Sequence, residues 1–399
     1  KVFINLYANN QTRTELNYIQ NFEVTKNINS GLFIQADNGL EAIDNNGDKF
    51  IDNQLGPKIV AMNKWEFLSD SLIYTIKGGV KFELSEKESG QLQSVLNRYI
   101  FRNQQEKIEG WAKIGFIFNK KGRSSGLQLS AFTDDKKFQF GNKTLSGKED
   151  QLYINWIYAD IIKNSNHSIK AGINYVYNNL KNHYNELGYA WNNNIIGFFN
   201  EYSFKPTNKF SLIGGLRYDY SLRWGGVLTP RIHGRVEIIE NNVLRFSGGL
   251  GTKSPNPFFE NIGVFASSRE VKISSNLTQE QAWNYGFNFS HKSKLFNRPI
   301  TVSTDFYRTD FLNKLVANYD LSANEILFYN LSNGSYANSL MVQIITKPIK
   351  RIEITTAYRY YDVQTKFNGT SYQRNPLTPA NRAFLNSDIA LGKKWNWDL

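Results

Sequence analysis

The chain has 399 residues, of which 41% are hydrophobic, 15% aromatic and 21% charged, a composition that excludes an intrinsically disordered protein. It contains no cysteine and has a formal net charge of +12, which excludes disulfides and cysteine-based metal centres and suggests an anionic neighbour such as nucleic acid, phospholipid or lipopolysaccharide. No apolar run approaches the ~18 residues of a membrane helix, but a β-barrel stays open because only alternate residues of its strands face lipid.

Both ends of the chain lie inside apolar runs. It begins Lys1-Val2-Phe3-Ile4 and ends Trp395-Asn396-Trp397-Asp398-Leu399. We therefore expect a longer natural protein, so that the missing initiator methionine and signal peptide carry no information about targeting.

An acidic segment at residues 44–52 begins like a calcium-binding loop, with side-chain oxygens at alternate positions. The helix-loop-helix calcium motif fails, because Lys49 replaces its turn glycine and Leu55 its bidentate glutamate. Two interpretations stay open, a solvated acidic loop and a looser calcium site. The second would use Asp44, Asn46, Asp48 and Asp52.

A hydrophobic period of two dominates the rest of the chain. Over residues 72–84, apolar side chains such as Ile76 and Val80 alternate with polar ones such as Lys77 and Lys81. Such stretches exceed the ~5 to 6 residues of soluble sandwich strands and reach the ~9 to 11 residues that cross a bilayer at a tilt. The pattern predicts long membrane strands with one apolar and one polar face.

The connections between the predicted strands alternate in length. Short turns are expected near 69–70, 120–125, 163–166, 206–208, 240–242, 292–298, 348–350 and 392–394. Long loops are expected near 86–110, 134–150, 180–194, 252–280, 312–336 and 364–381. Tight turns on one side and long loops on the other are typical of outer-membrane barrels, and this template gives roughly nineteen strands. We therefore predict an all-β fold, a transmembrane antiparallel β-barrel over residues 1–399.

One catalytic motif is matched by chance. Gly122-Arg123-Ser124-Ser125-Gly126 fits G-x-S-x-G, but a nucleophile elbow requires a buried strand before it and a helix after it. Amphipathic strands flank this segment, which favours a polar hairpin turn. The sequence therefore predicts no enzyme.

Candidate ligand contacts lie in the predicted long loop at 180–194. His183 there is accompanied by Tyr184, Tyr189 and Trp191, and aromatic side chains can pack on a ligand without any chemistry. An ordinary exposed loop is the alternative. None of the four histidines belongs to H-E-x-x-H or H-x-x-x-H, so no catalytic metal site is predicted.

Cationic residues cluster at Lys120-Lys121-Gly122-Arg123, at 292–294, at 347–351 and at Lys393-Lys394. Each cluster falls in a predicted short turn, and stacking aromatics do not share a platform with them, so nucleic acid is not an expected partner. The clusters are expected on one rim of the barrel, opposite the long loops. This placement weakens lipopolysaccharide as their explanation.

Several segments in a fixed order resemble the TonB-dependent outer-membrane receptors, particularly the Bacteroidetes type. Residues 229–233 resemble the family's "PR" strand start, and residues 245–261 resemble its "G-x-G-x-R-x-P-N" segment. Residues 277–284 resemble its "L-x-P-E-x-x-W-N" segment. Lys253 stands where the family has Arg, and Gln279 where it has Pro. The segments are 229–233, 245–261, 277–284, 305–311, 329–331 and 379–386.

The resemblance implies a 22-stranded barrel in the outer membrane of a Gram-negative cell, closed by an N-terminal plug on which the TonB complex pulls. The plug and the TonB-contacting segment are not in this sequence, and further strands are expected after Leu399. Outer-membrane lipid, lipopolysaccharide and a surface lipoprotein are implied partners. No cofactor is implied apart from the open question of calcium.

We therefore expect energised uptake of a scarce ligand, namely a siderophore, cobalamin, a chelated metal, a glycan or a peptide. The ligand contacts are expected from His183, Tyr184, Tyr189 and Trp191, together with Asn256, Phe258 and Phe259 of the loop at 252–280. A passive porin and an all-β carbohydrate-binding module are the alternatives.

Overall fold

The computed structural model describes residues 2–71, 73–367, 369, 371–376, 378–392 and 395–398. Among these residues, nineteen strands follow one another in the order of the sequence, and each is antiparallel to the next. They are β1 (Val2–Ala8), β2 (Arg13–Thr25), β3 (Ile28–Gly39), β4 (Gly56–Leu68), β5 (Tyr74–Gly90), β6 (Ile100–Ile117), β7 (Ser124–Phe140), β8 (Lys143–Ile161), β9 (His167–Tyr184), β10 (Leu187–Thr207), β11 (Phe210–Ser221), β12 (Gly225–Ile239), β13 (Asn242–Lys253), β15 (Glu280–Leu295), β16 (Arg298–Asn318), β17 (Glu325–Ile349), β18 (Ile352–Thr365), β20 (Asn381–Ala390) and β21 (Asn396–Asp398). The predicted all-β fold and the predicted number of strands are confirmed.

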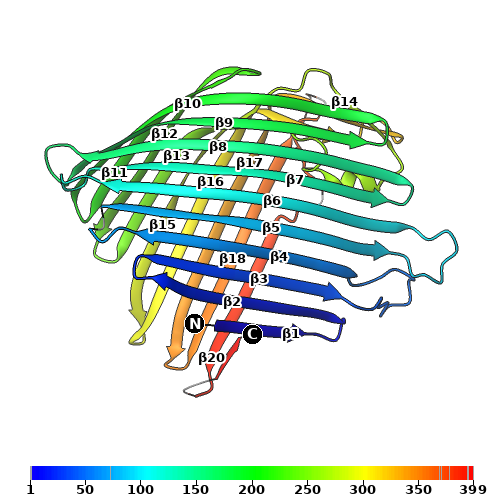
Figure 1. The fold of residues 1–399 in the computed structure, drawn as a ribbon, viewed down its shortest axis with the longest axis horizontal. Coiled ribbons are helices and arrows are strands. Elements are labelled where there is room, and N and C mark those ends of the chain that lie inside the picture. Colours follow the sequence, from blue (N-terminus) through cyan, green and yellow to red (C-terminus); the bar gives the residue numbers. More distant parts are fainter. Residues whose placement is uncertain are drawn as a thin grey trace.

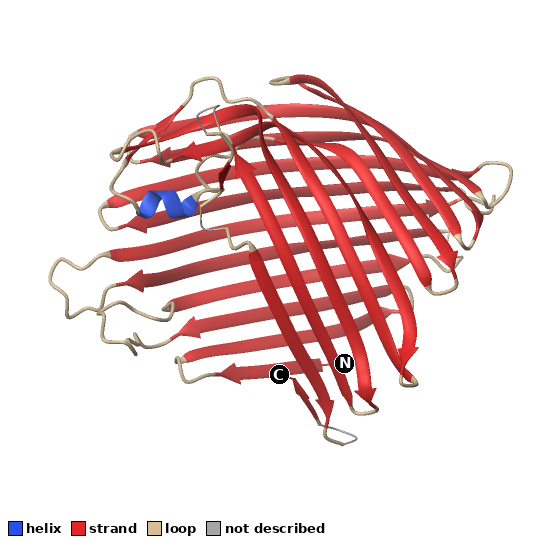
Figure 2. Cartoon of the chain, turned by 180° about the vertical axis from the view of Figure 1, so that it is seen from behind, coloured by secondary structure: helices blue, strands red, loops and turns tan. Residues whose placement is uncertain are grey.

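The sheet curls around itself. In Figures 1 and 2 the strands of the N-terminal half cross in front of or behind the long strands β15 to β18, as the two walls of a barrel do. Two short strands join the same sheet, β14 (Glu270–Ile273) parallel to β17 and β19 (Gln373–Arg374) antiparallel to β18. In the described part of the chain, β1 pairs with β2 alone and β21 with β20 alone.

Helix is almost absent from the described residues. The element η1 (Ile262–Ala266) is a single short 3₁₀ segment, and no helix in this part of the chain is both long and apolar enough to cross a membrane.

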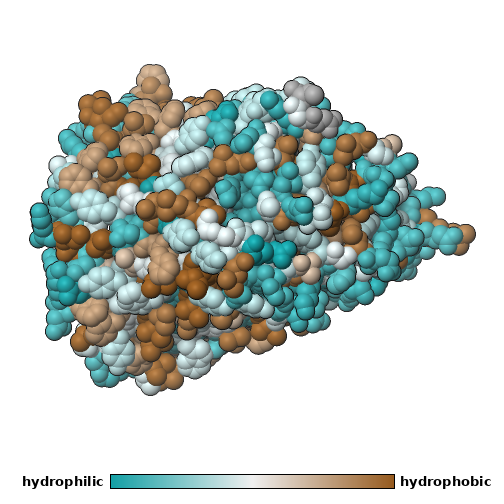
Figure 3. Space-filling view, turned by 90° about the horizontal axis from the view of Figure 1, so that it is seen from above, coloured by the Kyte–Doolittle hydropathy of each residue, from teal (hydrophilic) through white to brown (hydrophobic). Residues whose placement is uncertain are grey.

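The two faces of the sheet differ as the alternation predicts. On β5, Ile76, Val80, Phe82 and Leu84 are exposed on the outer face, while the odd-numbered residues from 75 to 85 are half-buried on the inner face. Leu72, where the predicted strand began, lies outside the described residues, and β5 begins at Tyr74. Figure 3 shows apolar residues, in brown, gathered over the left and middle of one face and a mostly hydrophilic end at the right.

Seven of the eight turns predicted to be short lie at one end of the strands, which we call the short-turn rim. The eighth, at 392–394, includes residues 393 and 394, which lie outside the described residues. In the described residues the short-turn rim comprises the connections at 26–27, 69–71 with 73, 118–123, 162–166, 208–209, 240–241, 296–297, 350–351 and 391–392 with 395. The connection at 118–123 is a hairpin between β6 and β7, with Ile117 paired to Ser124. The G-x-S-x-G match therefore belongs to a hairpin, as predicted, but only Gly122 and Arg123 lie in the turn, and Ser124 to Gly126 begin β7.

The opposite end, the long-loop rim, differs from prediction at four places. Strand replaces most of the loops predicted at 86–110, 134–150, 180–194 and 312–336. The second and third shrink to two-residue turns at 141–142 and 185–186, and the fourth to residues 319–324. Gly141 and Asn185 have positive φ angles, as such tight hairpin turns require. β7 to β10 are longer than the ~9 to 11 residues that cross a bilayer, because apolar side chains at their ends, such as Phe138 and Tyr184, belong to a buried cluster.

Candidate functional site

The longest connection, residues 254–279 between β13 and β15, folds back onto the inner face of the sheet at the long-loop rim. It contains η1 and β14, and the helix, blue in Figure 2, lies beside the ends of the strands. Parallel pairing of β14 with β17, Val271 opposite Ile326, fixes the far half of this loop. We call residues 254–279 the inner loop.

A buried apolar cluster joins the inner loop to the inner faces of β7 to β10 and of β16 and β17. Phe258 and Phe265 are completely buried, and the Phe265 ring lies 4.7 Å from the ring of Tyr184 and 6.5 Å from that of Phe328. The buried members are Phe138, Phe140, Leu145, Tyr184, Phe258, Val264, Phe265, Val271, Leu277, Leu315, Ala317, Ile326 and Phe328. Burial of this much apolar surface gives the loop one defined position.

Three hydrogen bonds also join the inner loop to the strands beneath it. Trp191 Nε1 donates to the Pro255 carbonyl at 3.1 Å, and Asn182 Nδ2 donates to Asn256 Oδ1 at 3.0 Å. Lys143 Nζ donates to the Ser267 carbonyl at 3.1 Å. The inner loop is therefore attached to β8, β9 and β10 along its first half.

The structure brings six of the seven predicted ligand contacts together, but in a different setting. Tyr184 ends β9, and Tyr189 and Trp191 lie in β10, so their assignment to a long loop was wrong. Tyr184 and Trp191 are only 5% and 6% exposed. The reason is that each packs against the inner loop, which supplies the other three residues, Asn256, Phe258 and Phe259.

His183 is separated from this group. Neighbouring residues of a strand face opposite sides, so His183 is exposed on the outer face while Tyr184 faces inward. The binding role of all seven residues stays a prediction, and alanine at Tyr184 or Trp191 would also loosen the inner loop.

Next to the inner loop, the inner wall holds a cavity of 660 Å³. It is lined by β8 to β13 and by the ends of the inner loop, and both Arg217 and Arg231 reach it. Arg231 Nη2 lies 2.7 Å from a Glu201 carboxylate oxygen, and Lys170 Nζ lies 3.5 Å from the other oxygen of Glu201. Arg217 pairs with Asp219 at 2.6 Å.

A buried asparagine contacts one of the arginines that line this cavity. Asn174, 1% exposed, receives a hydrogen bond from Arg217 Nη2 at 2.8 Å, but its own Nδ2 has no partner among the described residues. Gly197 pairs with both Asn174 and Asp219, and a Cβ there would lie within 2.2 Å of an oxygen of each side chain. Only glycine fits, so the cluster depends on it.

Sequence reasoning missed this cluster. The available signal was the repetition of Asn174, Asn178 and Asn182 at alternate inward positions of β9, because asparagine is unusual in the middle of long strands.

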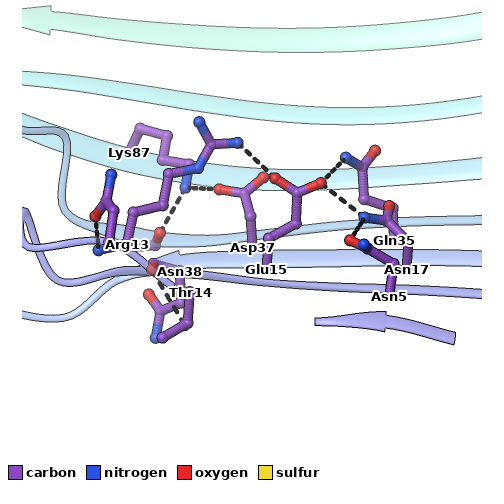
Figure 4. A network of polar contacts seen from close by, with 11 residues as sticks. Asn5, Arg13, Thr14, Glu15, Asn17, Gln35, Asp37, Asn38 and Lys87 are labelled. Carbon is purple, nitrogen blue, oxygen red and sulfur yellow. Dashed lines mark hydrogen bonds and ion pairs between the residues drawn. The ribbon is translucent and has the colours of Figure 1, made fainter. Parts of the chain in front are cut away.

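A second polar network covers the inner face near the β1 edge of the sheet (Figure 4). Glu15 accepts hydrogen bonds from Asn17 at 2.8 Å and Gln35 at 3.2 Å and pairs with Arg13 at 2.9 Å. On the same face, Lys87 of β5 pairs with Asp37 of β3. The inner wall is therefore polar well beyond the cavity.

Two tyrosines in connections at the long-loop rim pack against the buried cluster. Burial raises the pKa of Tyr319 and of Tyr99, and the nearby Tyr184 adds to the effect at Tyr99. Both phenols therefore stay neutral and able to donate hydrogen bonds at physiological pH.

The acidic segment uses its oxygens on its own backbone. Asp44 accepts from the amides of Gly47 and Lys49, and Asp52 accepts from that of Asn45. Within the described ranges, no group of three His, Cys, Asp or Glu side chains is placed to hold a metal ion. The looser site at Asp44, Asn46, Asp48 and Asp52, which includes an asparagine, stays a prediction.

The sequence model of the family "TonB dependent receptor-like, beta-barrel" matches residues 5–398. A search of curated protein sequences finds no match. Among solved structures, the alcaligin outer-membrane receptor FauA from Bordetella pertussis is 12% identical with a TM-score of 0.67, and the match covers 98% of this chain and 66% of that one.

Two other solved structures are similar. The ferripyoverdine receptor of Pseudomonas aeruginosa, bound to ferripyoverdine, is 10% identical with a TM-score of 0.69, covering 98% of this chain and 59% of that one. The copper transporter OprC is 10% identical with a TM-score of 0.73, covering 98% and 67%. At these identities the likeness shows the fold, and this chain spans about two thirds or less of the receptors' length.

Proposed function

Because this chain belongs to the TonB-dependent receptor β-barrel family, we propose that it forms the wall of an outer-membrane transporter that takes up a scarce ligand with energy delivered through TonB. The family match over nearly the whole chain carries the proposal. The polar cavity beside the inner loop supports it, since a transporter needs a place to hold its ligand inside the wall.

The charge of the cavity favours an anionic ligand. Lys170 and Arg231 line it and share the single carboxylate of Glu201, so this wall carries an excess of positive charge. The other two lining cations are paired, Arg217 with Asp219 and Lys253 with Glu260 and Glu280. Of the ligands that remain open, namely siderophores, cobalamin, chelated metals, glycans and peptides, a negatively charged metal chelate fits this excess best.

Uptake by cells that produce the full-length protein tests the proposal. We expect accumulation of at least one probe from a panel of ⁵⁵Fe-loaded anionic siderophores, ⁵⁷Co-cobalamin and labelled oligosaccharides. Accumulation should stop when a protonophore removes the proton gradient, while binding at the cell surface persists. Uptake that continues unchanged without the gradient would indicate a passive porin, and a chain that is soluble without detergent would indicate the carbohydrate-binding module.

Replacement of Arg231 by Gln should weaken binding of the transported anionic probe about tenfold, because a hydrogen bond to a charged group contributes ~1.5 to 3 kcal/mol. Equilibrium binding to cells measures the effect. Lys49→Gln, in a distant connection, is the matched control and should bind like the parent. Equal affinity of R231Q and the parent would show that the probe does not bind in this cavity.

Labelling of intact cells tests the orientation. The chain has no cysteine, so single cysteines report cleanly, and long loops of outer-membrane barrels lie outside the cell. A membrane-impermeant maleimide should label Glu186→Cys, in the exposed turn after β9, and spare Asn208→Cys, in the exposed turn after β10. The reverse pattern would invert the barrel.

A surface lipoprotein, lipopolysaccharide and the Bacteroidetes type stay predictions. The first would favour a glycan or peptide ligand, and its co-purification with the full-length protein would reveal it.

A further inference from the structure

The positive charge of the chain is concentrated at one end of the strands. Within the described residues, the connections of the short-turn rim carry eight cationic side chains against two carboxylates, Asp70 and Glu240. The cationic residues are Lys26, Lys120, Lys121, Arg123, Lys163, Lys209, Lys350 and Arg351. Lys393 and Lys394 of the predicted clusters lie outside the described residues.

The long-loop rim has no such excess. Its connections lie at 9–12, 40–55, 91–99, 141–142, 185–186, 222–224, 254–279, 319–324, 366–367 and 371–376. Their acidic residues are Glu41, Asp44, Asp48, Asp52, Glu186, Glu260, Glu270 and Asp320. Their basic residues are Lys49, Arg98, Arg223, Arg269, Lys272, Lys366 and Arg374. The acidic and basic charges of the long-loop rim nearly cancel, so the excess of positive charge is confined to the short-turn rim.

Five cations of the short-turn rim are left without ion pairs in the part of the chain that the structure describes. Lys26 pairs with Asp70 at 3.2 Å, and Lys120 and Arg123 pair with Asp160 at 3.0 and 2.9 Å. The other five are all exposed and lie in four different turns. They are Lys121, Lys163, Lys209, Lys350 and Arg351, which we call the rim cations.

Exposed apolar side chains lie among the rim cations. Phe296, at the tip of the turn after β15, is 91% exposed, and Ile162 and Ile349 are exposed beside Lys163 and Lys350. The phosphate backbone of a nucleic acid offers no apolar surface to these side chains, whereas a bilayer interface accepts apolar groups next to Lys and Arg heads. The combination therefore favours lipid.

The outer face next to this rim also offers space for an acyl chain. An apolar groove of 730 Å³ extends along β3 to β8 from Ile28 at the rim. It is hollow because Gly78, Gly110 and Ala112 lie between the bulky side chains of its border.

We propose that the rim cations form a binding surface for anionic phospholipid headgroups of the leaflet that adjoins the short turns, with acyl chains packed on the outer face. Clustered Lys and Arg at a membrane surface attract anionic lipid in this way. The proposal rests on the proposed function only in that the barrel spans a bilayer, and it requires neither TonB nor a ligand.

Native mass spectrometry of the full-length protein tests this with phosphatidylglycerol and phosphatidylcholine of identical acyl chains. The parent should retain phosphatidylglycerol about tenfold more strongly, and 0.5 M salt should reduce this preference because exposed charges are screened. Replacement of all five rim cations by Gln should bring the preference to within about twofold of unity.

The matched control replaces five exposed cations by Gln, two in connections of the long-loop rim and three in the parts of β7, β8 and β9 next to that rim. They are Lys49, Lys137, Lys148, Lys181 and Arg374, and none has an ion pair in the described residues. This variant has the same net charge as the rim variant and should keep the parent's preference. Heat-modifiable migration on gels verifies that each variant is folded.

Two outcomes would overturn the proposal. A rim variant that keeps its preference, or a control that loses it equally, would show that the rim cations do not select lipid. A parent that binds polyglutamate through these residues but treats both lipids alike would point to an acidic protein. Loss of energised uptake would leave the lipid result standing, whereas failure of the parent to insert into bilayers would refute both proposals.

Discussion

Replacement of Val80 by Arg should destabilise the folded barrel by about 2 to 4 kcal/mol, the cost of a cation near the bilayer midplane of a membrane β-barrel. Val80 lies near the middle of β5 and is 43% exposed on the outer face. Its neighbours across the sheet, Asn63 and Gly110, offer no carboxylate to pair with the new charge. Urea titration of the barrel in lipid vesicles measures the change.

The control places the same cation on the inner face at similar depth. Ser130 pairs with Trp111, which in turn pairs with Gly79, the residue next to Val80. Gly79 itself is unsuitable, since a Cβ there would lie 2.9 Å from the Asn63 carbonyl oxygen. Ser130→Arg should cost less than Val80→Arg, because the inner wall already carries Lys and Glu side chains. Equal costs would refute the assignment of faces.

Replacement of Phe265 by Ala should release the inner loop while the barrel stays assembled. Phe265 is completely buried among the rings of Tyr184, Phe258 and Phe328, and truncation of such a side chain costs about 3 to 5 kcal/mol. The inner loop is not one of the nineteen sequential strands. The lost free energy therefore makes local opening of the inner loop easier and does not disassemble the barrel. Trypsin should cleave after Arg269 or Lys272 at least about a hundredfold faster.

Phe296→Ala is the control, because this phenylalanine is almost fully exposed and its removal should leave the cleavage rate unchanged. Heat-modifiable migration should stay the same in both variants. Unaltered cleavage of F265A would mean that the pairing of β14 with β17 and the hydrogen bonds to Pro255, Asn256 and Ser267 hold the loop without the cluster.

Local patterns in the sequence are enough to determine the fold class of this protein. Alternation along 72–84 identifies which side chains of β5 face outward, because successive residues of a strand point to opposite faces. Alternately short and long connections separate the two rims, because an antiparallel meander returns to the same end at every second turn. These features depend only on neighbours in the sequence, and the ordered motifs from Thr229 onward add the family.

The tertiary structure alone decided what the candidate site is. Tyr184 and Phe265 are 81 residues apart, and no period in the sequence indicates that their rings pack together or that Trp191 binds the Pro255 carbonyl. The loop predicted at 180–194 became strand because the inner loop covers its inner face, and that cover comes from a distant segment. The sequence thus specified faces, rims and family through local periodicity, whereas the cavity wall and its loop arose from contacts that only the curvature of the sheet brings into reach.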